Sequence, residues 1–243
     1  MRNYEAEYKA RIEYIRGVVE SARAGGIVFG NSGGKDSALT GILCKAACPN
    51  TLGLIMPCGP SRNYNEDMAD ARALCGKYNI DCEVIDLAGI KNDFIKLLER
   101  AGPLSETARI NIAPRLRMTA LYAIAANKHY LVAGTDNRSE LYTGYFTKWG
   151  DGAYDFNPIA DLTATEVLEF LRYLGAPESI ITKQPSAGLF DGQTDETEMG
   201  ISYGVLDSYI LGGAAREADI ALIERLHAAS AHKRRMPDMF RPK

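Results

Sequence analysis

One stretch of this chain, residues 27–37, limits its possible folds more than any other. Ile27-Val28-Phe29 predicts a buried strand, small residues follow it, and an Ala/Leu-rich helical pattern begins at about Lys35. Small residues let backbone N–H groups close on a phosphate, and the N-terminus of the helix directs its positive dipole end to the same point. The stretch therefore predicts a phosphate-binding loop. A turn without a ligand is the alternative, but two glycines between serines and an aspartate cost much chain entropy for a turn alone.

Asp36 narrows the kind of loop, because its carboxylate would repel bare phosphate unless a divalent cation lay between them. A Walker A loop is excluded, since Phe29 and Asp36 stand where that motif needs Gly and Ser/Thr. The dinucleotide pattern G-x-G-x-x-G is excluded because Ser32 stands two places after Gly30. The remaining pattern, Ser-Gly-Gly-x-Asp-Ser after a strand, resembles the pyrophosphate loop of enzymes that split ATP into AMP and pyrophosphate.

Composition excludes several classes of protein. A chain of 243 residues fits one α/β domain or two small ones. Neither a membrane-spanning stretch nor a signal-peptide pattern occurs, which predicts a cytoplasmic protein without membrane contact. A net charge of −3 and a pI of about 5.7 disfavour a general nucleic-acid binder. Five cysteines without C-x-x-C spacing predict reduced thiols rather than a zinc site.

Strand and helix patterns alternate along the chain after an amphipathic helix at residues 3–24. Short apolar strands between helices predict a parallel sheet covered on both faces, which is a doubly wound α/β fold. The predicted strands are residues 26–30, 51–56, 82–87 and 129–134. The other predicted helices are residues 36–47, 64–78, 89–100, 114–128, 137–144, 163–174, 202–211 and 215–230.

Ligands of open parallel sheets bind at the carboxyl ends of the strands. Three loops follow predicted strands at that edge, at residues 32–37, 57–59 and 134–137, and we expect them to form one crevice. Residues 183–201 lack a regular pattern, and a loop of that length is usually functional, often as a lid. Its acids, which include Asp195, are expected on a solvated surface.

Two strand-to-helix segments add charge near this crevice. Arg115 and Arg117 stand in the first turn of a helix, where they oppose its dipole, so they indicate an anionic partner or else a surface ion pair. Glu140 follows Asn137 by three residues, which is the spacing of a capping box. Together with Asp36, Glu140 is also a candidate second ligand of magnesium.

Residues 144–159 interleave aromatic residues, a lysine, two acids and three glycines. A hairpin-like surface turn is one interpretation. As a substrate wall, its aromatic rings could stack on a ring, Lys148 could bind a carboxylate or phosphate, and Asp155 could accept ribose hydroxyls.

Taken together, these segments resemble the ammonia-dependent NAD synthetases, and they occur in that family's order over nearly the whole chain. The most specific match is Gly-Tyr-Phe-Thr-Lys-x-Gly-Asp-Gly at residues 144–152 combined with Pro-Ser-Ala-Gly-Leu at residues 185–189. The other matching segments are residues 32–37, 111–118, 134–140, 193–196, 200–203 and 232–235.

The resemblance implies one domain over residues 1–243, with a C-terminal basic tail and no glutaminase domain. The implied fold is the three-layer, Rossmann-like fold of the adenine-nucleotide α-hydrolases. Magnesium is implied between Asp36 and Glu140. The implied ATP contacts are Gly30, Asn31, Ser32, Gly33, Gly34, Lys35, Asp36, Ser37, Thr135 and Ser186. The implied contacts of deamido-NAD, in a site at a homodimer interface, are Arg115, Lys148, Asp155, His232 and Lys233.

One position departs from the family pattern. The family usually has a lysine for the ATP phosphates early in the helix after Asp161-Leu162, whereas this chain has Ala164 there. Lys183 or Lys35 could supply the charge instead.

The implied reaction activates the nicotinate carboxylate of deamido-NAD by attack on the α-phosphorus of ATP, with release of pyrophosphate. Ammonia then attacks the acyl-adenylate and gives NAD and AMP. Asp36 acts through the metal, and Asp151 is the candidate base that deprotonates ammonium. Ammonia is the expected donor because only about 26 residues precede the first strand, far fewer than a glutaminase domain needs.

Two alternatives remain at this point. One is another pyrophosphate-loop enzyme, a GMP-synthetase-like amidase or a tRNA thiolase, although the absence of C-x-x-C and the negative net charge argue against a thiolase. The other is a nucleotide-binding protein without turnover, which Ala164 favours and which Asp36 and Glu140 oppose.

Overall fold

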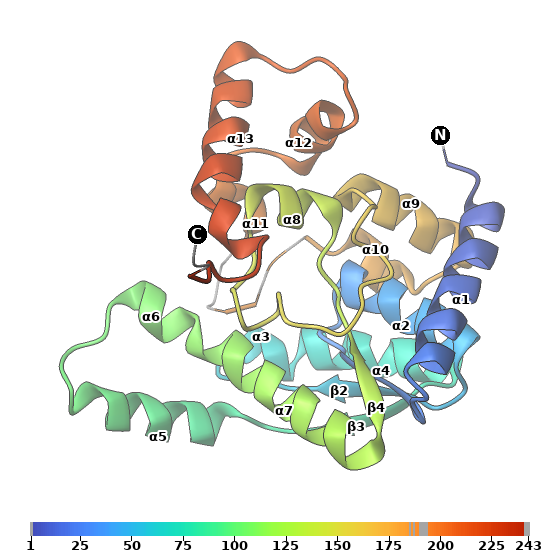
Figure 1. Cartoon of the computed structure of the whole chain (residues 1–243), viewed down its shortest axis with the longest axis horizontal. Coiled ribbons are helices and arrows are strands. Elements are labelled where there is room, and N and C mark those ends of the chain that lie inside the picture. Colours follow the sequence, from blue (N-terminus) through green and yellow to red (C-terminus); the bar gives the residue numbers. More distant parts are fainter. Residues whose placement is uncertain (1, 185, 187, 190–193, 241–243) are drawn as a thin grey trace.

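Four parallel strands form the centre of the computed structural model, which describes residues 2–184, 186, 188–189 and 194–240. They lie in the order β3-β2-β1-β4 (Figure 1), so the order reverses between β1 and β4. The strands are β1 (Gly26–Gly30), β2 (Thr51–Ile55), β3 (Asp81–Val84) and β4 (Tyr130–Ala133). All four predicted strands are confirmed. Strand β3 ends earlier than predicted, although Ile85 and Leu87 still donate backbone hydrogen bonds to the chain of β2 and its continuation.

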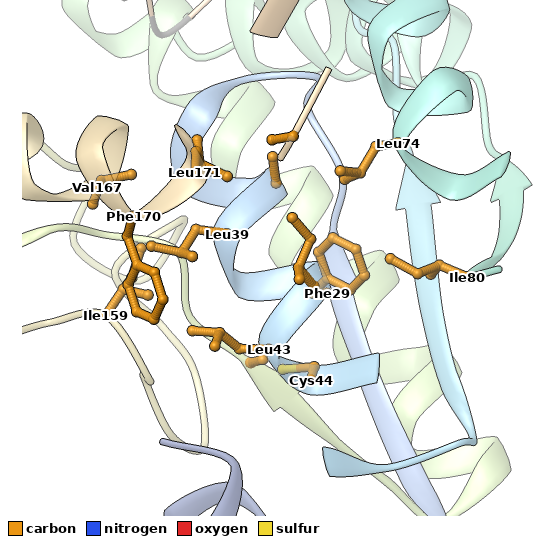
Figure 2. Close-up of a cluster of buried hydrophobic side chains, with 14 of the residues drawn as sticks. Phe29, Leu39, Leu43, Cys44, Leu74, Ile80, Ile159, Val167, Phe170 and Leu171 are labelled. Carbon is orange, nitrogen blue, oxygen red and sulfur yellow. The ribbon is translucent and has the colours of Figure 1, made fainter. Parts of the chain in front are cut away.

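Strands β1 and β2 are buried on both faces, as their uninterrupted apolar runs predict, whereas the edge strand β3 is largely exposed. In β1, Ile27 and Phe29 join one hydrophobic cluster and Val28 joins the other. In Figure 2, Phe29 lies toward Leu74 and Ile80. Leu39 and Leu43 of the same cluster lie toward Phe170 and Ile159. A Cβ atom at Gly41 would lie 2.5 Å from the Phe29 ring, so this close approach of helix to sheet requires glycine.

Helices cover both faces of the sheet and give the predicted three layers. Helices α2 (Lys35–Ala47) and α4 (Glu66–Tyr78) pack on one face, and α7 (Ile112–Lys128) packs on the other. Helices α1 (Tyr4–Ser21) and α9 (Ala164–Leu174) pack against α2. The predicted doubly wound α/β fold is therefore confirmed.

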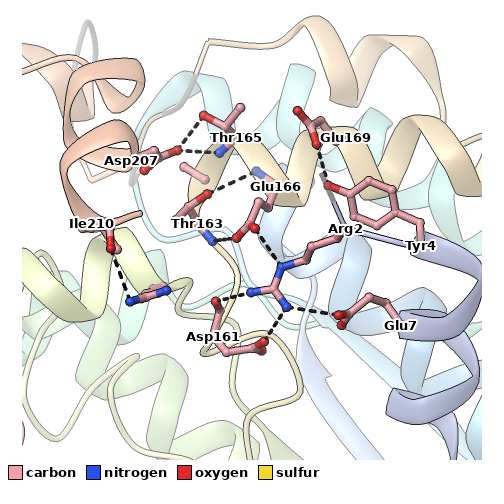
Figure 3. Close-up of polar contacts among 12 residues, drawn as sticks. Arg2, Tyr4, Glu7, Asp161, Thr163, Thr165, Glu166, Glu169, Asp207 and Ile210 are labelled. Carbon is pink, nitrogen blue, oxygen red and sulfur yellow. Dashed lines mark hydrogen bonds and ion pairs between the residues drawn. The ribbon is translucent and has the colours of Figure 1, made fainter. Parts of the chain in front are cut away.

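Helices near the carboxyl edge complete the wall around the loops. Helix α8 (Arg138–Thr143) packs with α12 (Tyr203–Ile210) and α13 (Glu217–Ala229). Asp207 joins this group to α9, because its Oδ2 accepts hydrogen bonds from the backbone N–H and hydroxyl of Thr165 at 2.7 and 2.6 Å (Figure 3). Its Oδ1 accepts a hydrogen bond from Ser139 in α8.

The sequence patterns did not predict several short elements. Each has only three to five residues, which is too few to show helical periodicity. These elements are α3 (Ser61–Tyr64), α6 (Glu106–Ile110), α10 (Glu178–Thr182), α11 (Asp195–Met199) and η1 (Ala231–Lys233). One of them, α3, takes Tyr64 from the predicted helix 64–78, so α4 begins after Asn65. Helix α5 (Ala88–Glu99) was predicted, and it packs on α7.

Within the described residues, no helix is both long enough and apolar enough to span a membrane.

Candidate active site

A cavity of about 460 Å³ lies at the carboxyl ends of β1, β2 and β4. Ser32, Pro57 and Thr135 line it from the loops that follow these strands, so the three loops meet in one crevice as predicted. Arg117 of α7 lines it as well, and it donates hydrogen bonds to the carbonyl of Met56 and to Asn63 at 3.0 and 3.2 Å. The crevice opens where the strand order reverses, the usual ligand position of this fold class.

The phosphate loop has the conformation that its glycines allow. Gly33 has φ of +73°, and a Cβ atom there would lie 2.2 Å from the carbonyl oxygen of Asp67. The hydroxyls of Ser32 and Ser37 lie 3.1 Å apart at the start of α2. Asn31 is buried and donates to the carbonyl of Ala71 at 3.1 Å, so its side-chain amide joins the loop to α4. All residues predicted to contact ATP except Gly33 line the cavity.

Asp36 and Glu140 both line the cavity and are joined through Asn137. The Nδ2 of Asn137 donates to Oδ1 of Asp36 at 3.0 Å, and its backbone N–H donates to Oε2 of Glu140 at 2.9 Å. Glu140 therefore belongs to a capping box and also faces the cavity. Burial and the nearby charge of Asp36 raise the pKa of Glu140 well above its usual value.

Lys35 lies beside these acids. Its Nζ is 2.5 Å from Oδ2 of Asp36 and 5.2 Å from the centre of the Tyr203 ring. Burial lowers the pKa of Lys35, but the charges of Asp36 and Glu140 outweigh that effect and raise it, so the side chain stays an ammonium. Ala164 packs in the same hydrophobic cluster as Tyr203 and is 1% exposed.

Lys183, the other lysine considered for the phosphates, also lines the cavity. Its Nζ is bound between two carboxylates, 2.7 Å from Asp67 and 2.8 Å from Asp70. Its charge is therefore already neutralised by residues of α4.

A second acidic pair, Asp136 and Asp151, also lines the cavity, and the charges of Asp36 and Glu140 act on Asp136. Asp136 is 4% exposed, and its Oδ2 has no hydrogen-bond partner among the residues that the structure describes. Asp151 accepts a hydrogen bond from the backbone N–H of Thr147 at 2.8 Å. Burial raises the pKa of both carboxyls, and the charge of Asp151 adds to the effect on Asp136.

The predicted contacts of deamido-NAD divide into two groups. Lys233 lines the cavity, and its Nζ donates to the carbonyls of Gly144 and Phe146 at 2.8 and 2.7 Å. Lys148 donates to the carbonyl of His232 at 2.7 Å, and Arg115 donates to the carbonyl of Lys148 at 3.3 Å. Arg115, Lys148 and His232 therefore form a second group outside the cavity lining.

Asp155 also lies outside the cavity lining. It accepts a hydrogen bond from the backbone N–H of Val132 at 2.7 Å and one from the hydroxyl of Tyr122 at 3.3 Å.

The expectation that Asp195 lies on a solvated surface is wrong. Asp195 begins α11, is buried, lines the cavity and accepts a hydrogen bond from the hydroxyl of Tyr203 at 3.1 Å. Asp195 follows Thr194, the N-cap of α11, and Gly200 ends the helix in the left-handed conformation, so the signals for this helix are its two caps. Pro185, Ala187 and Gln193 of the matching motifs lie outside the described residues, so the predicted lid over residues 183–201 is described only in part.

Within the ranges that the structure describes, no three His, Cys, Asp or Glu side chains gather in a way that could hold a metal ion alone. A cation here would need further oxygen ligands besides Asp36 and Glu140. Magnesium in nucleotide enzymes commonly has this arrangement, with one or two carboxylates and the remaining ligands from phosphates and water. The donor set therefore fits a magnesium ion that arrives with a nucleotide.

Comparisons with known proteins agree on one family. A family model described as NAD synthase matches residues 7–237. An NH(3)-dependent NAD(+) synthetase of Carboxydothermus hydrogenoformans is 46% identical over 240 residues, which is 98% of each chain. An NMN synthetase structure from Francisella tularensis has a TM-score of 0.92 at 35% identity and covers 98% of this chain and 99% of that one. An NH3-dependent NAD synthetase structure from Campylobacter jejuni, in complex with nitrate, has a TM-score of 0.82 at 31% identity and covers 99% and 100%.

Proposed function

The chain belongs to the NAD synthase family, and we propose that it is an ammonia-dependent ligase that amidates deamido-NAD to NAD with ATP. The observation that carries this proposal is the agreement between the match over residues 7–237 and the cavity, where the phosphate loop and the acids of the matching motifs line one space.

The chemistry has two steps that the cavity residues can serve. A carboxylate oxygen of the nicotinate ring forms a bond to the α-phosphorus of ATP, and the bond from that phosphorus to pyrophosphate breaks. Ammonia then bonds to the acyl carbon, the bond from that carbon to AMP breaks, and a proton leaves the nitrogen. The N–H groups of the loop at residues 32–37 and the start of α2 would bind the departing pyrophosphate.

Magnesium would be held by Asp36 and Glu140 together with phosphate oxygens. When bound, it supplies positive charge against the charge that develops on pyrophosphate. The convergence of the two carboxylates through Asn137 supports this role, and their own repulsion without a cation agrees with the raised pKa of Glu140.

Asp151 is our candidate for the base that takes a proton from ammonium. Burial raises its pKa above the ordinary value, which makes its carboxylate a stronger base. Asp136 lines the same cavity, and an ammonium ion bound beside the two acids would offset the burial of their charges.

We also propose a homodimer whose second copy borders the substrate site. Helix α5 has no buried residue and carries an exposed apolar stripe of Ile90, Phe94 and Leu97, of which Ile90 and Leu97 are 58% and 59% exposed. Helix α6, which follows it, lines the cavity through Thr107 and Ile110. A partner on α5 would therefore lie beside α7 and next along the chain to α6, and both α6 and α7 line the cavity. Sedimentation should give a dimer, and Leu97→Glu should give a monomer; an active monomeric wild type would contradict the proposal.

The substrate of this amidation has a second candidate, a nicotinate mononucleotide. The resemblance to the Francisella tularensis NMN synthetase, at a TM-score of 0.92, favours it. The reaction is the same in both cases, and only the adenylate half of the dinucleotide is missing.

The test offers the purified protein magnesium, ATP, ammonium and either the dinucleotide or the mononucleotide, and measures AMP and the amide. We expect NAD to form faster than the mononucleotide amide, and the reverse order would establish the second candidate. Glutamine freed of ammonium should give almost no product, and equal rates from both donors would contradict ammonia dependence. AMP without an amide would contradict the proposed function itself.

Five free cysteines agree with a cytoplasmic setting, which we include in the proposal.

A further inference from the structure

The lysine of the phosphate loop occupies an unusual position. Lys35 is the first residue of α2, where the helix dipole disfavours a cation, and it is only 6% exposed. A buried ammonium needs a partner of opposite charge. The negative charges around Lys35 in the described residues are carboxylates of the cavity, so the position of Lys35 depends on them.

Several groups hold the ammonium among these carboxylates. Oδ2 of Asp36 is 2.5 Å from its Nζ, and the ring of Tyr203 faces it at 5.2 Å. Tyr203 in turn donates a hydrogen bond to Asp195. Asp36, Glu140 and Asp195 act electrostatically on Lys35 in that order of strength.

We propose that Lys35 is the internal counter-ion of the Asp36–Glu140 pair, and that the divalent cation must displace it from Asp36 in order to bind. The inference rests on the proposed role of these two carboxylates. The displaced ammonium remains in the same cavity, where nucleotide phosphates provide its next partner. Lys35 is thus a positioning residue that makes metal binding depend on nucleotide.

The hydrogen bonds of Asp36 show why the two cations compete. Oδ1 of Asp36 accepts from Asn137, and Oδ2 is taken by Lys35. A metal that binds Asp36 must therefore share or replace one of these contacts, and the ammonium is the contact that its charge repels. Without nucleotide, the metal must break this ion pair with nothing to receive Lys35. With nucleotide, the phosphates receive it, so each ligand strengthens the binding of the other.

Lys183 provides a matched control within the same cavity. Its ammonium is also largely buried and also paired with carboxylates, but those are Asp67 and Asp70 of α4. Neutralising Lys183 removes the same charge from the cavity without freeing Asp36. A general effect of charge would appear in both variants, whereas competition at Asp36 would appear in only one.

The experiment measures binding of Mn²⁺, as a probe for the divalent site, by electron paramagnetic resonance without nucleotide. Lys35→Met should bind Mn²⁺ about tenfold more tightly than wild type, a typical size of coupling between two ligands. Lys183→Met should match wild type, and Asp36→Asn should abolish the tight binding that Lys35→Met creates. In the presence of a non-hydrolysable ATP analogue, wild type should gain Mn²⁺ affinity and Lys35→Met should gain much less.

Equal Mn²⁺ affinity of Lys35→Met and wild type, with nucleotide-dependent binding intact, would overturn the counter-ion role and leave the proposed function standing. If wild type and Asp36→Asn bind Mn²⁺ equally well in the presence of nucleotide, the assignment of Asp36 as a metal ligand is overturned. If Lys35→Met does not fold, Lys35→Gln keeps a polar group of similar length and serves the same comparison. An increase in its thermal midpoint on adding Mn²⁺, larger than that of wild type, supports the proposal, and an equal increase contradicts it.

Discussion

Two regions of this molecule contain similar sets of charged residues and use them differently. The terminal ion network, formed by Arg2, Glu7, Arg11, Asp161 and Glu166, joins the N-terminal segment and α1 to α9 and the segment before it. Figure 3 shows Arg2 among Glu7, Asp161 and Glu166. The cavity acids, formed by Asp36, Asp136, Glu140, Asp151 and Asp195, line the candidate active site. Two guanidinium groups serve three acids in the network, whereas Lys35 is the ammonium bound directly to one of the cavity acids.

Acidic pKa values shift in opposite directions in the two regions. Burial would raise the pKa of Asp161 and Glu166, but hydrogen bonds and charge from Arg11 and Arg2 outweigh it and lower both. Burial raises the pKa of Asp136 and Glu140, and neighbouring acids raise it further. The ionised acids of the network therefore stabilise the folded chain. In the cavity, burial and mutual repulsion disfavour the ionised acids, and a cationic ligand would relieve this cost.

The largest expected effect is at Asp36. Asp36→Asn removes a charged metal ligand, so the rate of AMP release should fall on the order of a thousandfold. Its free energy of unfolding, measured with urea, should fall as well, because the buried ammonium of Lys35 loses its direct carboxylate partner, so the rate is compared per folded molecule. A folded variant that releases AMP at a near-normal rate would contradict the assignment of Asp36 as a metal ligand in the reaction.

Arg11 should show the opposite pattern. It is buried, and its guanidinium lies 2.7 and 2.8 Å from the two carboxylate oxygens of Asp161. Arg11→Leu removes the hydrogen bonds of this guanidinium to Asp161, Glu7 and the carbonyl of Pro158, which should lower the free energy of unfolding by about 2 kcal/mol, while Arg2 remains as a partner of both acids. Activity per folded molecule should remain. A loss of activity at unchanged stability would show that the network also serves the site.

The smallest expected effect is on the pH dependence of stability at Asp136. Asp136 has an orphaned buried oxygen, so Asp136→Asn should raise the free energy of unfolding at neutral pH by about 1 kcal/mol. Because the folded pKa of Asp136 is raised, its penalty exists above that pKa and disappears as the pH falls toward the ordinary value of 3.8. The advantage of the variant should vanish over the same range in urea titrations.

Wild type should behave differently in acid because of the network. The folded pKa of Asp161 is lowered, so its contribution is present above the unfolded value of 3.8 and is lost as the pH falls through the folded value. Arg11→Leu should flatten this acid-side decline. An advantage of Asp136→Asn that grows toward acid would contradict the assignment of opposite signs.

Much of the fold follows from local sequence patterns, and the two regions show where that stops. The strand at residues 26–30 was predicted residue for residue, because its apolar run is bounded by glycines. The loop after it was recognisable because its small residues lie next to Asp36. The network was not predictable, since Arg11 and Asp161 are 150 residues apart and only the tertiary fold brings them together. Asp195 was missed for a related reason, because its burial depends on Tyr203 and on a five-residue helix.

The proposed acyl-adenylate is tested most directly by following one oxygen atom of the substrate carboxylate. Deamido-NAD labelled with heavy oxygen in the nicotinate carboxylate is converted with magnesium, ATP and ammonium, and the AMP is analysed by mass spectrometry. If the carboxylate attacks the α-phosphorus and ammonia then displaces AMP, one labelled oxygen must appear in the phosphate of AMP. Amide formation with unlabelled AMP would show that no acyl-adenylate forms and would contradict the role assigned to the cavity.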